Sequence, residues 1–61
     1  MPLVTVKALE GKTVEQKRAL VKDITEAVVK HFEVEPDKVT VDIVLISKDN
    51  LGKAGQLFID R

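Results

Sequence analysis

Hydrophobic and polar positions divide the chain into stretches with different periods. Residues 3–9 read Leu-Val-Thr-Val-Lys-Ala-Leu, and their short length and β-branched content predict a β-strand. Residues 39–46 read Val-Thr-Val-Asp-Ile-Val-Leu-Ile and predict a second strand, whose alternate residues face opposite sides. Between these stretches, apolar residues recur at the spacing of one helix face, at Leu20, Val21, Ile24, Ala27, Val28 and His31 or Phe32.

Local signals mark the ends of the predicted helix. Gly11 breaks the first strand, and Thr13 stands three residues before Gln16, the spacing of a capping box. In that motif the threonine and glutamine side chains satisfy backbone N–H groups at the start of the helix. We expect the helix to end near Phe32, because a proline and a turn-forming pair follow within residues 33–37.

The remaining segment, residues 51–59, is apolar and contains two glycines, which predicts a small hairpin or arm that needs a packing partner. Two strands joined through a helix at this spacing form a βαβ unit with parallel strands. The second strand is apolar on both faces at its C-terminal end, whereas one helix covers one face. We therefore expect a single α+β domain over residues 1–61, with a second subunit on its other face.

The small size of the chain makes association the expected source of stability. A domain of 61 residues buries a small fraction of its surface, and such domains usually rely on disulfides, a metal or oligomerisation. The chain has no cysteine, and its single histidine, His31, argues against a histidine-based metal site. Hydrophobic residues make up 44% of the sequence, which is high for a small monomer. We predict a homo-oligomer without a metal or other cofactor.

Charge and aromatic content argue against two classes of partner. Ten basic and ten acidic residues cancel, whereas nucleic-acid binding rests largely on accumulated positive charge. Two phenylalanines, with no tryptophan or tyrosine, provide no platform for stacking bases. We find no apolar run long enough to span a bilayer and no basic-then-apolar leader. We therefore expect a cytoplasmic protein with neither nucleic acid nor membrane as partner.

Pro2 is the strongest candidate for chemistry. Met1 is normally removed when the next residue is small, and its removal would leave Pro2 with a free secondary amine at the start of a strand. A basic nitrogen on a backbone with fixed φ is suited to act as a general base. Taken alone, Pro2 is better explained as the start of an edge strand, where proline is tolerated. If Met1 is retained, the nitrogen of Pro2 is an amide and cannot act as a base.

Several short motifs occur in the order typical of one enzyme family. The chain resembles the 4-oxalocrotonate tautomerase group of the tautomerase superfamily over essentially its whole length, through Met1-Pro2, Leu9-Glu10-Gly11-Lys12, Glu15-Gln16-Lys17 and the arm Gly52-Lys53-Ala54-Gly55. The resemblance implies a hexamer built as a trimer of dimers, in which two βαβ units form a four-stranded sheet with helices on one face. It also implies that the C-terminal arm reaches across to a neighbouring subunit.

The resemblance further implies a reaction and a role for Pro2. In this family the amino-terminal proline is the general base that takes a proton from an enol or an acidic carbon of an unsaturated keto acid and returns it to another carbon. A free α-amino group has a pKa of about 8, which burial and a nearby cation both lower. The apolar arm and the strands would supply the burial here, and Lys12 the cation.

Three positions depart from the family pattern. Lys12 stands where the best-known members have an arginine, and lysine keeps the charge but loses the planar fork that holds a carboxylate. Thr40 stands where those members have a second arginine, so a neutral hydroxyl replaces a cation that polarises the substrate oxygen. Leu51 replaces an aromatic residue of the pocket wall and keeps it apolar. We expect Pro2 to act as the base, and Lys12, Thr40 and Leu51 to bind the substrate. Dicarboxylates should bind more weakly than they do to the family members that have the arginines.

Other interpretations stay open at this point. The chain could be a non-catalytic oligomeric scaffold, or a small-ligand-binding protein that keeps the fold. Hydrolytic dehalogenases of the superfamily use a protonated proline together with a carboxylate that activates water, and Asp42 and Asp49 are the candidates for that carboxylate. In the tautomerase interpretation, the partner is a small-molecule enol or keto acid.

Overall fold

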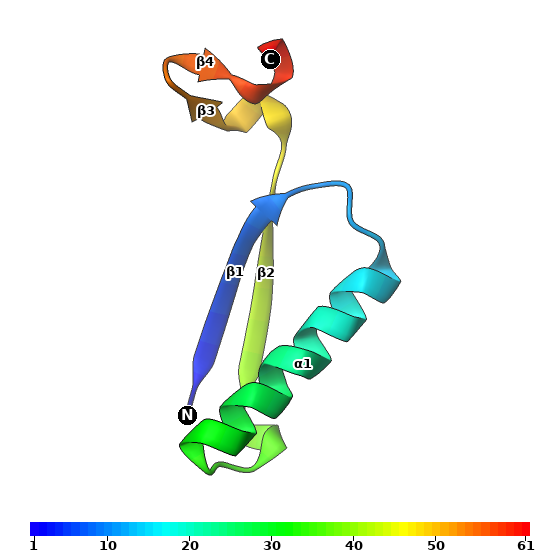
Figure 1. The fold of residues 1–61 in the computed structure, drawn as a ribbon, viewed down its shortest axis with the longest axis vertical. Coiled ribbons are helices and arrows are strands. Elements are labelled where there is room, and N and C mark those ends of the chain that lie inside the picture. The colour runs from blue at the N-terminus through cyan, green and yellow to red at the C-terminus, as the bar shows by residue number, and fades with distance from the viewer.

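The computed structural model describes residues 1–61 as a strand–helix–strand unit followed by a small hairpin (Figure 1). The elements are, in order, strand β1 (Leu3–Leu9), helix α1 (Val14–Phe32), strand β2 (Thr40–Ile46), strand β3 (Gly52–Lys53) and strand β4 (Gln56–Leu57). β1 and β2 are parallel, with Leu3 opposite Thr40 and Leu9 opposite Ile46, and β3 and β4 are antiparallel. The predicted α+β fold, with a parallel βαβ unit and a C-terminal hairpin, is confirmed.

The predicted capping box holds the start of α1. The Gln16 N–H donates to the Thr13 hydroxyl oxygen at 3.1 Å, and the Thr13 N–H donates to the Gln16 side-chain oxygen at 2.9 Å. At the other end, Glu33 adopts a left-handed φ of 55° and its N–H donates to the Val29 carbonyl oxygen. Both predicted ends of the helix are confirmed, because each depends on a local signal in the sequence.

Strand β2 begins one residue later than predicted. The Val39 N–H donates to the Pro36 carbonyl oxygen at 3.1 Å and closes a 3-10 turn over Pro36–Lys38. Pro36 favours this turn, because its fixed φ suits the first position of a helical segment. Thr40 is therefore the first residue of the strand, and its N–H donates to the Pro2 carbonyl oxygen at 3.1 Å.

Alternation along the two strands gives the sheet two different faces. Half-buried side chains alternate with exposed ones over Leu3–Ala8 and Thr40–Val44, and the alternation breaks at the end of each strand. Val6 and Ile43, which share a cavity with residues of α1, belong to the half-buried set. The opposite face, called the open face below, carries the exposed side chains of Leu3, Thr5, Lys7, Thr40, Asp42 and Val44.

The face of α1 that meets the sheet agrees in part with the predicted one, since Val21, Ile24 and Val28 are half-buried. The half-buried residues of the helix are Lys17, Val21, Ile24, Thr25, Val28 and Val29. The prediction that Ala27 and His31 or Phe32 lie on this face is wrong, since all three are exposed and Phe32 keeps 68% of its surface. Two apolar stripes overlap on this helix, and periodicity alone does not choose between them.

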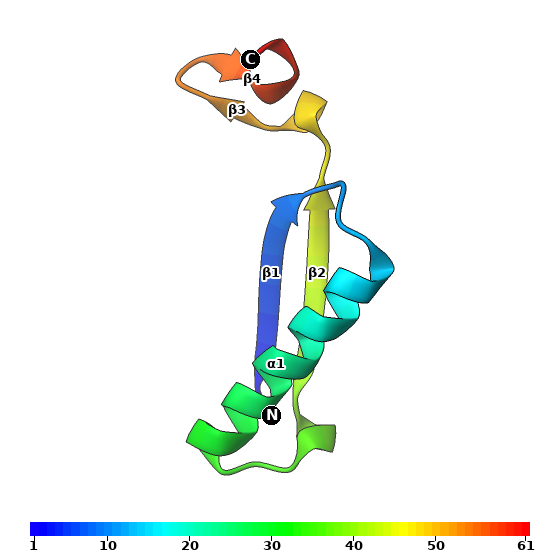
Figure 2. The same cartoon turned by 45° about the vertical axis from the view of Figure 1, so that its right-hand side comes forward.

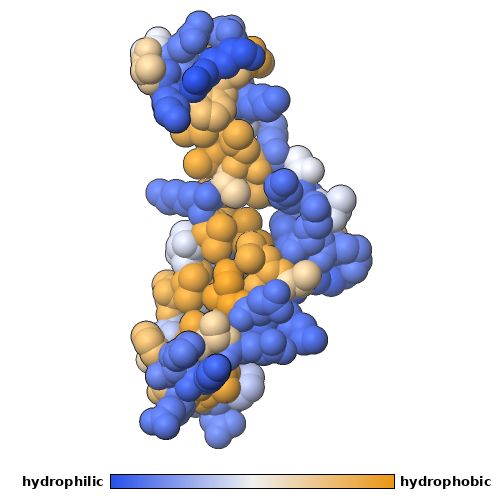
Figure 3. Space-filling model, viewed as in Figure 1, coloured by the Kyte–Doolittle hydropathy of each residue, from blue (hydrophilic) through white to orange (hydrophobic).

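A single chain has no buried core. No residue is fully buried, and Leu3 and Phe32 keep 66% and 68% of their surface. The radius of gyration is 14.8 Å, whereas a compact chain of this length would have about 10.5 Å. The hairpin stands apart from the βαβ unit (Figure 2), and a continuous apolar surface runs beside α1 (Figure 3). The chain thus leaves apolar surface for other subunits to cover.

The structure contains no helix with both the length and the hydropathy of a membrane span.

Candidate active site

Pro2 is held at the start of the parallel strands. Its carbonyl oxygen accepts the N–H of Thr40, and the next residue, Leu3, pairs with Thr40 in the register of the sheet. Pro2 is half-buried, whereas Met1 before it keeps 91% of its surface. The nitrogen of Pro2 is an amide while Met1 is attached.

Lys12 lies beyond the opposite end of the strands. The Glu10 N–H donates to the Ile46 carbonyl oxygen at 3.0 Å, so hydrogen bonds hold the chain up to the turn. Gly11 follows with a φ of 117°, a conformation that glycine adopts without the strain a side chain would cause. Lys12 comes next, directly before the capping residue Thr13, so the turn and the helix cap together fix where it leaves the backbone.

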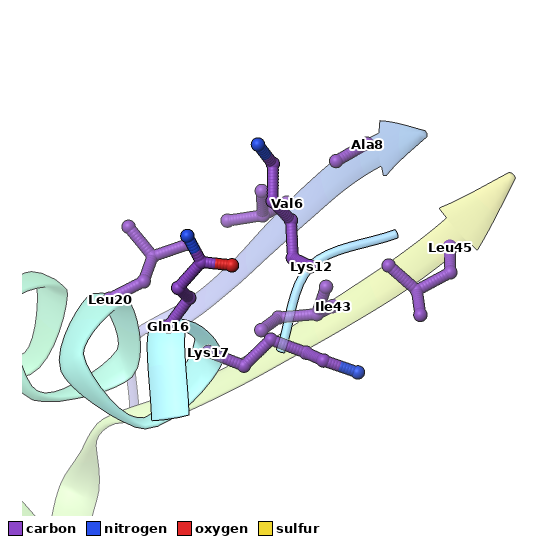
Figure 4. A pocket seen from close by; sticks show the side chains of 8 residues that line it. All are labelled: Val6, Ala8, Lys12, Gln16, Lys17, Leu20, Ile43 and Leu45. Atoms are coloured by element: carbon purple, nitrogen blue, oxygen red, sulfur yellow. The ribbon is translucent and has the colours of Figure 1, made fainter. Parts of the chain in front are cut away.

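The side chain of Lys12 lines a cavity of about 250 Å³ between the start of α1 and the sheet (Figure 4). The other lining residues are Gln16, Lys17 and Leu20 from α1, and Val6, Ala8, Ile43 and Leu45 from the strands. In the view of Figure 4, Ile43 lies between the side chains of Lys12 and Lys17. Two cations thus border an apolar floor, and no aspartate or glutamate lines the cavity.

Leu51 is half-buried and lies between the 3-10 turn Lys48–Asn50 and the first strand of the hairpin, β3. Its carbonyl oxygen accepts the Phe58 N–H at 2.8 Å, which closes the hairpin segment on itself. The guanidinium of Arg61 lies over the Phe58 ring, 5.2 Å from its centroid. Leu51 therefore marks the base of a small arm that carries an aromatic ring and a cation beyond the sheet.

The four predicted site residues form two groups at opposite ends of the strands. Pro2 and Thr40 lie where β1 and β2 begin, whereas Lys12 and Leu51 follow the ends of these strands. The seven residues of β1 span about 23 Å, and the Lys12 side chain extends back from the end of the strand to line a cavity with Val6. Pro2 does not line the cavity that holds the Lys12 side chain, so a single chain does not bring these two residues to the same cavity. The influence of Lys12 on the proline amine stays a prediction.

The structure also reveals a side-chain pair that the sequence pattern does not show. The Thr5 hydroxyl donates to Oδ1 of Asp42 at 2.7 Å on the open face, next to the pair of Leu3 and Thr40. Asp49, the other carboxylate considered, accepts a hydrogen bond from the Ser47 hydroxyl beyond the end of β2. Of these two carboxylates, Asp42 alone lies towards Pro2. No cluster of three or more His, Cys, Asp or Glu side chains lies close enough together to hold a metal ion.

Comparison with known sequences points to one family. The family model described as tautomerase enzyme matches residues 2–61. The chain is 48% identical to a probable tautomerase of Halalkalibacterium halodurans over 61 residues, which cover both chains completely. It is 47% identical over 60 residues to a 2-hydroxymuconate tautomerase of Bacillus subtilis, with 98% of this chain and 97% of the relative covered.

Solved structures share the fold over nearly the whole chain. The crystal structure of YwhB, a homologue of 4-oxalocrotonate tautomerase, matches with a TM-score of 0.92 at 45% identity and covers 98% of each chain. A heterohexameric 4-oxalocrotonate tautomerase from Chloroflexus aurantiacus matches with a TM-score of 0.89 at 25% identity, covering 98% of this chain and 97% of that one. The hairpin as well as the βαβ unit is thus common to these proteins.

Proposed function

We propose that this chain, which belongs to the tautomerase family, is an isomerase that moves a proton within an enol or unsaturated keto acid. The general base is the amine of Pro2, freed by removal of Met1. The observation that carries the proposal is that Pro2 is half-buried, bonded to Thr40, and the first residue of the family match. A backbone held in this way would fix the direction of the amine's lone pair.

The proposed reaction requires one base and contacts to the substrate. The neutral amine of Pro2 takes a proton from the enol hydroxyl or an acidic carbon, and the electron pair enters the conjugated system of the substrate. The resulting ammonium returns the proton to another carbon, which restores the neutral amine. Lys12 binds the substrate carboxylate, Thr40 donates its hydroxyl hydrogen to the substrate oxygen, and Leu51 forms an apolar wall.

The proposal includes assembly into a homo-oligomer, with a hexamer built as a trimer of dimers as the expected form. In one chain Pro2 does not line the cavity that holds Lys12, which supports a site that takes Pro2 from one copy and Lys12 from another. The apolar surface that a single chain leaves uncovered supports such an association. One of the structural relatives is a heterohexamer.

Two measurements test the proposal. Mass spectrometry of the intact protein is expected to give the mass without Met1. The purified protein should then convert the enols 2-hydroxymuconate and phenylenolpyruvate to their keto forms, measured as a change in ultraviolet absorbance. Equal rates for the processed protein and its Pro2→Ala variant would exclude Pro2 as the base for these substrates. A chain that keeps Met1 and lacks turnover would instead fit the non-catalytic, ligand-binding alternative.

A further inference from the structure

Helix α1 carries two charged residues, Asp23 and Lys30, that are exposed and take part in no ion pair. The ion pairs of the helix join Arg18 with Glu15 and Lys22 with Glu26. Asp23 and Lys30 are seven residues apart, about 10.5 Å along the axis, which is beyond the spacing at which side chains pair within one helix. Each of them is therefore free to pair with a second molecule.

These two charges belong to one stripe of the helix. Leu20, Asp23, Ala27 and Lys30 recur at spacings of three, four and three residues, which places them along one side of α1. All four are exposed. Leu20 also lines the cavity between α1 and the sheet, and in Figure 4 its side chain points towards Val6 of β1. This set of four residues, called the flank stripe below, thus borders the half-buried face of the helix.

The order of residues along the flank stripe is self-complementary. Asp23 and Lys30 stand at equal distances on either side of a point just before Ala27. When two such stripes meet antiparallel, Asp23 of each copy faces Lys30 of the other, as twofold symmetry requires. Ala27 then lies at the crossing point, where its small side chain allows the helix axes to approach to about 8 Å. A parallel arrangement would instead place like charges opposite each other.

We infer that the flank stripe binds the same stripe of a second copy in antiparallel orientation, with two reciprocal ion pairs between Asp23 and Lys30. The same contact covers part of the apolar surface that one chain leaves beside α1 (Figure 3). The inference rests on the homo-oligomer of the proposed function, and it adds the residues that select the partner and its direction. Ion pairs at the edge of a helix contact set partner choice and orientation more than total affinity.

Charge reversal tests the inference through association alone, which sedimentation over a range of protein concentrations measures without any turnover. Asp23→Lys and Lys30→Asp each place like charges opposite each other, and each should raise the dissociation constant of the oligomer about tenfold. The double variant that combines both substitutions restores opposite charges and should recover most of the affinity. Unchanged dissociation constants in both single variants, or a double variant that associates no better than either, would overturn the inference.

A mixture of the two single variants provides a second readout. The two positions carry only lysines in Asp23→Lys and only aspartates in Lys30→Asp, so opposite charges meet only between unlike chains. One variant is labelled with ¹⁵N, the two are refolded together in equal amounts, and native mass spectrometry counts the chains in each oligomer. Oligomers with equal numbers of the two chains should exceed their share in a random mixture. A random distribution would overturn the inference.

A third lysine separates the flank stripe from general charge. Lys22→Asp is the matched control, because it makes the same change of charge as Lys30→Asp at an exposed position of the same helix outside the stripe. It should leave the dissociation constant within about twofold of the original value. An equal effect of Lys22→Asp and Lys30→Asp would overturn the role of the flank stripe.

The outcome is separable from the proposed catalysis. Association that follows the charges of the flank stripe, together with no turnover of any enol, would overturn the proposed isomerase activity and leave this inference standing. Turnover that depends on Pro2, in an oligomer that neither charge reversal weakens, would overturn this inference alone. A protein that stays a monomer at every concentration would overturn this inference together with the proposed homo-oligomer.

Discussion

The two ends of the β1–β2 pair are constructed in different ways. At the Pro2 end, a backbone hydrogen bond from Thr40 fixes the chain next to the future amine. At the Lys12 end, a glycine turn, a helix cap and the base of a hairpin bring together side chains from loops and from α1. A base needs a fixed position and direction, whereas a carboxylate can be held by flexible charged side chains. The comparison suggests that each chain carries two half-sites, one for proton transfer and one for substrate binding.

Replacing Pro2, the proposed base, should have the largest effect on activity. We expect Pro2→Ala to lower kcat for enol ketonisation about 100-fold, the lower end of the range for general-base catalysis, because an alanine amine remains without the ring that fixes its direction. Pro36→Ala is the matched control, since it removes the other proline from an exposed turn. Steady-state kinetics on the processed proteins provide the measurement. A similar loss in both variants would show that the effect of Pro2→Ala is not specific to the base.

Changing the substrate-binding end should affect KM more than kcat. Lys12→Ala removes a charge-assisted contact and should raise KM about tenfold for carboxylate enols, with a smaller effect on neutral enols. Lys22→Ala, which removes an exposed charge of α1 outside the cavity that Lys12 lines, should leave both values unchanged. If Lys12→Ala changed KM equally for charged and neutral substrates, Lys12 would not be a carboxylate binder.

The helix cap next to Lys12 should contribute to stability. Thr13→Ala removes the hydroxyl that accepts the Gln16 N–H and should lower the free energy of unfolding by about 1 kcal/mol. Thr13→Ser keeps a hydroxyl and should retain most of that stability. Urea unfolding at one fixed protein concentration measures the difference, because the stability of an oligomer depends on concentration. Equal losses in the alanine and serine variants would argue against the cap as the cause.

The smallest effect is expected from the side-chain pair next to Pro2. Thr5 and Asp42 are both exposed, so loss of their hydrogen bond in Thr5→Val should cost about 0.5 kcal/mol. A double-mutant cycle with Asp42→Ala, which removes the acceptor oxygen, isolates the interaction from other effects of each substitution. Strictly additive changes in the free energy of unfolding would mean that the two side chains do not stabilise each other. The strand ends next to Pro2 would then be held together by backbone hydrogen bonds alone.

Features with local signals could be predicted from the sequence. The limits of β1 and α1, the capping box of Thr13 and Gln16, and the hairpin all agree with the structure, because each depends on residues close together in the chain. The start of β2 differs by one residue, since the turn closed by Pro36 takes the Val39 N–H. Side-chain period alone could not select the face of α1, because two apolar stripes overlap on it.

The arrangement of the candidate site could not be predicted from the sequence. Pro2, Lys12, Thr40 and Leu51 could be proposed as site residues from a family resemblance, but their separation depends on the length and register of two parallel strands. The bond between Thr5 and Asp42 likewise requires the register, which no local pattern contains. The half-burial of Lys17 depends on which face of α1 packs on the sheet, and the predicted face agreed with the observed one only in part.

Mixing two defective variants tests the division into half-sites most directly. Pro2→Ala and Lys12→Ala proteins are unfolded together in equal amounts, refolded, and assayed with a carboxylate enol at a concentration below its KM. If each site takes Pro2 from one copy and Lys12 from another, random assembly should make about one quarter of the sites intact and restore activity well above that of either variant. Activity no higher than the average of the two separate variants would contradict the account, because it would mean that no site combines Pro2 and Lys12 from different copies.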